Sequence, residues 1–445
     1  AAEPGPRTLR ARLEGVGKVL LAVRRIVTCT LVAAPAGVLA AAAFGLGVRA
    51  AEEPLLDYCV WAMELLGPTF IKLGQWASSR PDLFSEKVIS KLRRLQDDVK
   101  ARPWESARRS LDQAFGPEWE KQLLVQRKPI GSGCVAQVYR AELILDDGAT
   151  RDVAVKMIHP DVRRQVRGDM AILRFAASAL ERLPRMEYLA LSDTVKAFAR
   201  SMEDQLDMRV EAEHLRQFGK NFRNSDLASF PEVVEGMVSE GVLVETFLKG
   251  QPVNEYLGIE DKQLLGRLSD IGAKIILKMI FDDRYIHSDL HPGNVLVLFD
   301  ETTRKYRLGI LDCGLVVKTG RREHRAMVDI CLAFLQHKGY RAGELMVDNA
   351  RVHQCKDIDG FCRGVERIVD VAKTQRYFEH IGEYVMQVCA LACDYQVKVD
   401  PSYLHVALAL KVAEGISLGF DPDVEVAQKA IPTLIKAQSR YMLGR

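Results

Sequence analysis

Two polar clusters in the second half of the chain have residue types and spacing that suit phosphoryl-transfer chemistry. The first is the loop HSDLHPGN, in which Asp289 and Asn294 lie five positions apart. At this spacing the aspartate can orient or deprotonate a hydroxyl or a water while the amide oxygen of the asparagine reaches a metal. In the second cluster, Asp312 follows the apolar run LGIL and precedes Cys313 and Gly314. Asn294 and Asp312 are therefore the predicted Mg²⁺ ligands.

A glycine turn nearer the N-terminus offers backbone amides to a phosphate. The run Gly131-Ser132-Gly133 lies within PIGSGCVAQVYRAEL, so it is predicted to be the turn of an antiparallel hairpin. Small residues let a phosphate approach the backbone N–H groups closely, and ATP or ADP is the expected ligand. Four further residues are predicted to form the adenine site, two through side chains and two through backbone groups: Val138, Ala154, Glu245 and Phe247.

Lys156 and Glu211 complete the predicted phosphate site. Lys156 lies in the strand VAVK, where alternation places its flanking valine on the other face. The helix QLDMRVEAEHLRQF offers Glu211 as the catalytic ion-pair partner, and the long separation of the two predicts an inserted helix around 169–183. Taken singly, each feature has a plainer interpretation. The glycine run could be an ordinary hairpin, Lys156 an edge lysine and Glu211 a solvated acid. Asp312-Cys313-Gly314 could be a plain turn, and the histidines at 287 and 291 could simply have satisfied hydrogen bonds. Their order along the chain favours a nucleotide site.

Three stretches of the chain must position these residues. Residues 51–128 show helical periodicity punctuated by prolines, and residues 129–249 carry the hairpin strands together with helices. Residues 250–445 are mainly helical apart from VLVLF and RLGIL. This order predicts an α+β fold that is bilobal and protein-kinase-like, with a small antiparallel-sheet lobe at 129–249, a helical large lobe at 250–445 and an N-terminal helical extension.

The first 50 residues combine an arginine-rich start with an uncharged stretch at 26–48. That stretch is long enough to span a bilayer, and a single membrane helix is predicted. It is rich in Ala and Gly and contains Pro35, so a buried or interfacial helix is the alternative. Many arginines and few acids in the first residues would suit the remnant of a mitochondrial presequence.

Composition excludes several classes of protein. The chain has 62 basic and 59 acidic residues, and the net charge of +3 predicts no nucleic-acid partner. Its nine cysteines are scattered without a CxxC pair, which argues against a disulfide framework and a structural zinc site. Cys389 and Cys393 are one helical turn apart in an apolar helix and are predicted to be two buried small side chains rather than a metal pair.

With these residues in hand, the sequence resembles the aarF/UbiB-type (ADCK) atypical kinases over about residues 55–433. The resemblance rests on Lys72-Leu73-Gly74-Gln75 with the following SRPDLFS, and on GSGCVAQVY, VAVKMIHP, QLDMRVEAEHL, VLVETF, HSDLHPGN and LDCG. It implies that the helical extension lays Lys72 and Gln75 over the active site, where ordinary kinases admit a protein substrate. It also implies an ATPase or a small-molecule or lipid kinase, a mitochondrial inner-membrane location, and partners among membrane lipids, coenzyme Q pathway components or a membrane protein complex.

Two positions depart from the family pattern. The family's alanine-rich nucleotide loop is here a glycine turn, and its E-x-D partner for the lysine of K-x-G-Q reads Gln205-Leu206-Asp207. Only Asp207 can then supply charge to Lys72, so we expect a looser clamp on the pocket. The rival functions are a nucleotide-binding scaffold without turnover and a general protein Ser/Thr kinase, which differ from the favoured one in ATP hydrolysis and in phosphorylation of added protein.

Overall fold

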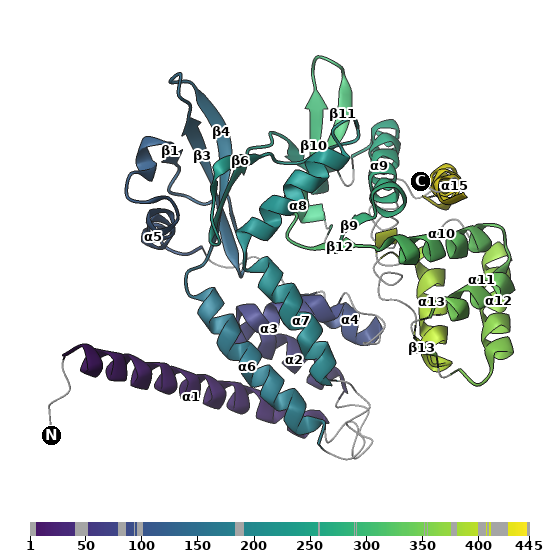
Figure 1. Cartoon of the computed structure of the whole chain (residues 1–445), viewed down its shortest axis with the longest axis horizontal. Coiled ribbons are helices and arrows are strands. Elements are labelled where there is room, and N and C mark those ends of the chain that lie inside the picture. The colour runs from purple at the N-terminus through teal and green to yellow at the C-terminus, as the bar shows by residue number, and fades with distance from the viewer. Residues whose placement is uncertain are drawn as a thin grey trace. The chain divides into compact units, whose positions relative to one another are not determined.

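The computed structural model describes most of the chain, and the statements below concern those residues. The described ranges are 6–40, 52–78, 86–92, 94–95, 101–182, 191–256, 259–288, 290, 292–350, 352–353, 355–374, 381–398, 406, 409–410 and 426–442. The chain divides into two compact units. Figure 1 labels the helices and strands along the chain. The first comprises Ala1–Asp146, Val155–Leu206 and Glu240–Val242, and the second Asp147–Ala154, Asp207–Ser239 and Leu243–Arg445. The lobe boundaries predicted from sequence stay predictions.

The first unit is mainly helical. Its helices are α1 (Pro6–Ala40), α2 (Glu52–Leu66), α3 (Pro68–Ser78), α4 (Glu86–Leu92), α5 (Trp104–Phe115), α6 (Val162–Leu180) and α7 (Leu191–Gln205). Helix α2 ends at Gly67, whose φ of +88° lets its N–H donate to the carbonyl of Met63 at 3.1 Å. Pro68 then opens α3, where a missing N–H costs nothing. Helix α6 covers most of the range 169–183 in which an inserted helix was predicted, and its status as an insertion stays a prediction.

Helix α1 is attached to the rest of the first unit by a buried ion pair. The guanidinium of Arg25 contacts both carboxylate oxygens of Asp169 on α6, at 2.7 and 2.8 Å, and the hydroxyl of Thr69 donates to the same carboxylate at 2.6 Å. Further along α1, the hydroxyl of Tyr58 donates to the carbonyl of Val32 at 2.9 Å.

The apolar part of α1 contains these attachment points and is still mostly exposed. The window Val23–Ala40 has a mean hydropathy of 1.5, and only 11% of it is buried. By length and composition it could cross a membrane, although a signal sequence would pass the same test. Residues 41–48 of the predicted span lie outside the described part of the chain.

A six-stranded sheet carries the glycine turn and the strand lysine. Its order is β1-β3-β4-β7-β6, with β2 paired to β3. The strands are β1 (Leu123–Val125), β2 (Gly131–Ser132), β3 (Ala136–Ile144), β4 (Thr150–Ile158), β6 (Val233–Val238) and β7 (Val242–Thr246). Pairs β1–β3, β2–β3 and β6–β7 are antiparallel. An antiparallel sheet was predicted, but β1 was not, since it lies in the stretch 51–128 that was predicted to be helical. The division between the two units falls within β4, after Ala154.

The second unit contains helix α8 (Met208–Asn221), which is capped by the side chain of Asp207, the acceptor of the N–H of Arg209. Helix α9 (Lys262–Leu277) continues into a π-helical turn (Lys278–Asp283) and then strand β9 (Tyr285–His287). The remaining strands are β5 (Ala228–Ser229), β8 (Gln251–Pro252), β10 (Val295–Asp300), β11 (Lys305–Ile310), β12 (Val316–Lys318), β13 (Val352–His353) and β14 (Val397–Lys398). The remaining helices are α10 (Arg321–Leu335), α11 (Gly339–Asp348), α12 (Ile358–Thr374), α13 (Ile381–Asp394) and α15 (Val426–Met442).

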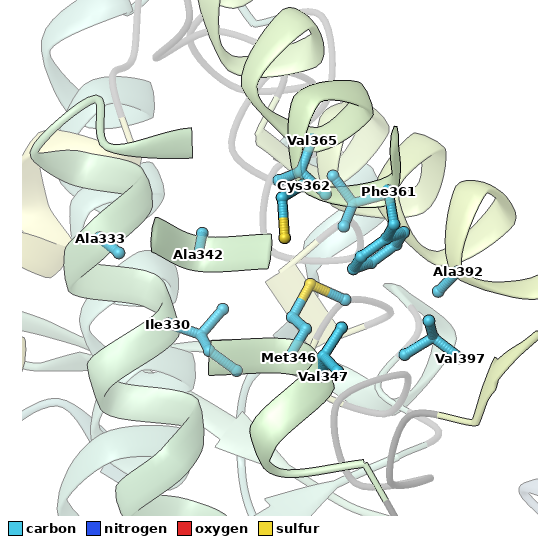
Figure 2. Close-up of a cluster of buried hydrophobic side chains, with 11 residues drawn as sticks. Ile330, Ala333, Ala342, Met346, Val347, Phe361, Cys362, Val365, Ala392 and Val397 are labelled. Atoms are coloured by element: carbon cyan, nitrogen blue, oxygen red, sulfur yellow. The ribbon is translucent and has the colours of Figure 1, made fainter. Parts of the chain in front are cut away.

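A compact apolar core joins α10, α11, α12 and α13 (Figure 2). Phe361, Cys362 and Val365 of α12 are fully buried against Met346 of α11. Small residues allow the two helices to approach, because a Cβ on Gly343 would lie 2.8 Å from the Cα of Cys362.

The prediction for the cysteines of α13 is only half right. Cys389 is buried, but Cys393 is exposed, because α13 presents the later of the two positions to solvent. A spacing of four residues places two side chains on neighbouring parts of a helix surface, yet only a full apolar stripe guarantees that both are covered.

Candidate nucleotide and metal site

A β-hairpin brings the two predicted metal ligands together. Strands β10 and β11 are antiparallel, with Val295 opposite Ile310. Asn294 directly precedes β10, and its carbonyl accepts a hydrogen bond of 3.0 Å from the N–H of Leu311. The next residue is Asp312. Two residues distant in sequence are thus placed at neighbouring ends of two bonded strands.

Helix α8 holds the loop after Asp312 through two side chains three positions apart. Glu211 accepts a hydrogen bond of 3.3 Å from the N–H of Cys313, and Nδ1 of His214 lies 2.8 Å from the carbonyl oxygen of Cys313. Because a carbonyl oxygen only accepts, Nδ1 must carry the proton. Both side chains are 8% exposed and Cys313 is fully buried, so solvent does not compete for these contacts.

A third contact fixes Asp312 itself. Nε2 of the buried His287, on β9, donates to the backbone carbonyl of Asp312. The Asp312 carboxylate accepts the N–H of Gly314 at 2.8 Å and is exposed. His287 is therefore a satisfied histidine with a positioning role, while His291 lies outside the described residues.

The contact of His214 was missed from sequence, and His287 was named only as a possible satisfied histidine, without its partner. The signal that could have found His214 is its i, i+3 spacing from Glu211, which puts both side chains on one face of α8. For His287, the signal was its place directly after the apolar pair Tyr285-Ile286, which predicts burial and hence a hydrogen-bond partner.

The donor set at the end of the hairpin fits Mg²⁺. An amide oxygen and a carboxylate are hard oxygen ligands, and Mg²⁺ in phosphoryl-transfer sites commonly takes one or two protein oxygens, with water and phosphate oxygens completing the octahedron. Asp312 is exposed and Asn294 is half-buried, so both can be reached from solvent.

The glycine turn forms the predicted hairpin, but its tip is held firmly. Gly131 pairs with Val138 across β2 and β3, and the N–H of Gly133 donates to the carbonyl of Ala136 at 2.8 Å. His159 then holds the tip at two points, since its N–H donates to Val135 at 2.9 Å and its Nε2 donates to the carbonyl of Gly133 at 3.0 Å. Burial lowers the pKa of His159, which favours the neutral imidazole.

Two features of this turn suit a phosphate. The hydroxyl oxygen of Ser132 is buried and has no hydrogen-bond partner. A Cβ built on Gly131 would have no protein atom within 4 Å, so the fold leaves space above the backbone there. A buried polar atom without a partner is costly, and a phosphate oxygen could satisfy it.

Lys156 lies on β4 where the sequence placed it. Ala154 and Lys156 share one face of the strand and are 7% and 8% exposed, whereas Val153 and Val155 are fully buried on the other face. Lys156 and Glu211 belong to different units, so their ion pair stays a prediction. Asp289 lies outside the described residues, and its catalytic role also stays a prediction.

The residues predicted to contact adenine are divided between the two units, with Val138 in the first and Ala154, Glu245 and Phe247 in the second. Val138 is half-buried on β3, and Glu245 is 2% exposed on β7. The N–H of Phe247 donates to the carbonyl of Asp152 at 3.2 Å, which extends the pairing of β4 with β7. An adenine hydrogen bond to this N–H would have to share it or replace the sheet contact, and adenine binding here stays a prediction.

The Lys72-Leu73-Gly74-Gln75 element lies on α3, and its glycine has a packing role. A Cβ on Gly74 would lie 2.1 Å from Cδ1 of Leu95 and 2.8 Å from Sδ of Met63. The amide of Gln75 approaches the carbonyl of Leu95 at 3.4 Å. The glycine thus lets α3 approach α2 and the segment after α4 closely.

Asp207, the predicted charge partner of Lys72, has a local role in the second unit. Its carboxylate accepts the N–H of Arg209 and forms an ion pair of 2.6 Å with the same residue's guanidinium. Asp207 therefore caps α8, the helix that carries Glu211 and His214. The placement of Lys72 and Gln75 over the active site stays a prediction, because they and Asp207 lie in different units.

Comparison with known proteins agrees with this architecture. A mitochondrial ABC1 family protein of Saccharomyces cerevisiae is 31% identical over 84% of this chain, and the chain spans 66% of that relative's length. A protein of Histophilus somni named "Probable protein kinase UbiB" is 27% identical over 84% of this chain and 69% of its own. A solved structure of a Mycobacterium tuberculosis protein complexed with erythromycin matches 84% of this chain and 91% of its own, with a TM-score of 0.55 and 21% identity, and this likeness concerns the fold alone.

The family itself follows from a sequence profile. The profile of the ABC1 atypical kinase-like domain matches residues 94–345, more than half of the chain. The matched range contains the glycine turn, Lys156, Glu211, Asn294 and Asp312. The predicted resemblance is therefore confirmed, and the chain belongs to the ABC1/UbiB family of atypical kinase-like proteins.

Proposed function

We propose that this protein binds ATP or ADP with Mg²⁺ and either hydrolyses ATP or transfers its terminal phosphoryl group to a small molecule or lipid. The observation that carries the proposal is the placement of two oxygen-bearing side chains at the end of one hairpin: the carbonyl of Asn294 accepts the N–H of Leu311, and Asp312 is the next residue. The loop after Asp312 is held at both backbone groups of Cys313. Fixed placement of charged groups is the main contribution that a protein makes to phosphoryl transfer.

Each residue has a role in this proposal. Asn294 and Asp312 would hold Mg²⁺, which when bound neutralises charge on the phosphate oxygens. The ammonium of Lys156 binds phosphate and is oriented by Glu211. Asp289 orients a water or hydroxyl and accepts its proton. The Ser132 hydroxyl donates to a phosphate oxygen, which agrees with the buried hydroxyl that lacks a partner, and so do backbone N–H groups of the glycine turn other than that of Gly133, which donates to Ala136.

We also propose a mitochondrial location at the inner membrane, with α1 as a single membrane helix and a role in coenzyme Q or lipid metabolism. A relative named as mitochondrial and the exposed apolar window of α1 support this location. The partners would be membrane lipids, quinone-pathway components or a membrane protein complex. Carbonate extraction of mitochondria tests the anchor, since a spanning chain stays with the membrane and a peripheral one is released.

The enzymatic proposal is tested by phosphate release from ATP with the purified 445-residue chain in lipid nanodiscs. We expect Mg²⁺-dependent release that falls about a hundredfold or more in Asp312→Asn and in Asp289→Asn. Asp300→Asn is the matched control, because Asp300 is a carboxylate at the other end of the same hairpin. It should retain wild-type turnover.

The rival functions predict different results in the same experiment. Nucleotide binding by calorimetry without phosphate release, with and without lipid, would replace the enzyme by a nucleotide-binding scaffold. Transfer of labelled phosphate to an added protein such as casein, in preference to water or lipid, would favour a protein kinase.

A further inference from the structure

The segment that leads into the predicted catalytic loop has an unusual backbone conformation. Helix α9 ends in the π-helical turn Lys278–Asp283, and Arg284 follows with a left-handed φ of +55°. Strand β9 begins at the next residue. π-Helical turns are uncommon and often occur at functional sites, because they widen the helix and need side-chain contacts to hold them. Within this turn, Lys278 and Asp283 form an ion pair of 2.6 Å across the five-residue spacing of the π-helix.

The C-terminal helix α15 contacts this turn through two cations. The guanidinium of Arg440 lies 2.9 Å from one carboxylate oxygen of Asp282, and the ammonium of Lys436 lies 3.3 Å from the other. The side chain of Asp282 is 17% exposed. A largely buried carboxylate needs charge compensation, and both cations that supply it here come from α15.

A second connection runs from α15 through a buried histidine. Nε2 of His324, on α10, lies 3.0 Å from the carbonyl of Ile280 within the turn, so Nε2 donates. The hydroxyl of Tyr441, on α15, contacts Nδ1 of the same ring. Burial lowers the pKa of His324 to about 4, so the ring is neutral at pH 7 and Nδ1 accepts the Tyr441 hydroxyl proton. The hydrogen bonds therefore run in one direction, from the Tyr441 hydroxyl to Nδ1 and from Nε2 to the carbonyl of Ile280.

The position of strand β9 depends on the π-helical turn. The carbonyl of Arg284 accepts the N–H of Thr319 at 3.1 Å, and β9 pairs with β12 in the register Ile286 to Val317. At the end of β9, His287 donates to the carbonyl of Asp312. A shift of the turn would therefore be transmitted through β9 to the metal-ligand loop.

We propose that α15 is a positioning element for the reaction centre: Arg440, Lys436 and Tyr441 hold the π-helical turn in its wide form and thereby place β9 and the loop that follows it. The proposal rests on the proposed phosphoryl-transfer function for its kinetic consequence, but not for its structural one. Figure 1 shows α15 beside α9, at the yellow end of the chain. The C-terminal helix would thus influence catalysis without contacting nucleotide.

The test compares two ion pairs made by the same helix. Lys436→Met/Arg440→Met removes both cations from Asp282, while the control Lys429→Met removes the 2.9 Å pair between α15 and Asp270 of α9. Amide hydrogen exchange is measured over residues 279–288 in the 445-residue chain. We expect exchange there to accelerate about fivefold or more in the double variant and to stay at the wild-type rate in the control.

Kinetics provide the second readout. We expect kcat for ATP hydrolysis to fall about fivefold in the double variant with KM for ATP within about twofold, because the glycine turn and Lys156 are untouched. Tyr441→Phe, which removes one hydroxyl and keeps the ring, should produce a smaller change of the same kind. Tyr441→Phe also tests the proposal if the double variant fails to fold. Arg440→Lys in the Lys436→Met background should restore part of the loss.

Two results would overturn the proposal. One is unchanged exchange over 279–288 in both the double variant and Tyr441→Phe. The other is equal acceleration in Lys429→Met, which would mean that α15 stabilises the unit generally. If the wild-type chain hydrolyses no ATP, the proposed function fails while the exchange experiment still decides the role of α15.

Discussion

Replacement of Arg25 by methionine should destabilise the first unit much more than replacement of its neighbour Arg24. The Asp169 carboxylate has no solvent exposure, and it is compensated by Arg25 and by the Thr69 hydroxyl. Methionine keeps the aliphatic volume of Arg25 and removes the charge. The variant leaves a buried carboxylate with one neutral donor in place of a guanidinium that contacts both of its oxygens.

The magnitude follows from burial and geometry. Breaking a buried ion pair by removing one partner costs about 3–5 kcal/mol. The Arg25 side chain is 24% exposed, so water can partly replace it, and we expect the lower end, about 3 kcal/mol. Asp169→Asn should cost less, about 2 kcal/mol, because the freed guanidinium can reach solvent. The double variant should cost clearly less than the sum of the single variants, since both remove the same interaction.

The assay is urea unfolding of the chain in detergent, combined with amide exchange over α1 and α6. Arg24→Gln is the control, because Arg24 directly precedes Arg25 on α1 and is exposed. It should change the free energy of unfolding by less than about 0.5 kcal/mol. An effect of Arg25→Met no larger than that of the control would refute the conclusion that this buried pair holds α1 to the unit.

Three further outcomes are expected. Gly131→Ala should leave the free energy of unfolding within about 0.5 kcal/mol of wild type, since no atom lies within 4 Å of the new Cβ, yet raise the Kd for Mg-ADP about tenfold by calorimetry; an unchanged Kd would exclude the turn from phosphate binding. The pKa of His324 is about 4 in the folded chain and 6.5 in the unfolded chain, so the unfolded chain binds the proton first as the pH drops. The free energy of unfolding therefore falls between pH 6.5 and pH 4, by at most about 3 kcal/mol. His324→Gln should flatten that part of the profile of unfolding free energy, and a fall of the same size in the variant would contradict the assignment. Among the cysteines of the described residues, the exposed Cys393 should react first with maleimide at pH 7.5, while the buried Cys362, whose pKa burial raises to about 11, should resist; a fast phase that persists in Cys393→Ala would be the contrary result.

Local patterns were sufficient where one short segment determines the geometry. The glycine hairpin and the strand of Lys156 were predicted because turn residues and alternation are read over about ten residues. VLVLF and RLGIL were predicted to be strands, but the pairing that places Asn294 beside Leu311 is known only from the structure.

Contacts between distant segments were not predictable in the same way. Asp169 was assigned only to an inserted helix, and nothing near it in sequence indicates that Arg25 neutralises it 144 positions away. His214 meets Cys313 across 99 positions, a pairing that only the folded chain determines. The π-helical turn continues the apolar periodicity of α9, so no residue pattern separates it from an ordinary helix end.

The two ends of the hairpin that carries Asn294 and Asp312 differ in how well they should tolerate a change of sequence. Its far end is a turn with four exposed residues, 301–304, where Asp300 accepts the N–H groups of Thr302 and Thr303. Six residue pairs lie between that turn and the metal ligands, a span of about 20 Å along the strands. A peptide tag or fluorophore placed in the turn would leave the ligand spacing intact. The hairpin thus offers an attachment point for following this protein in membranes while its candidate site stays native.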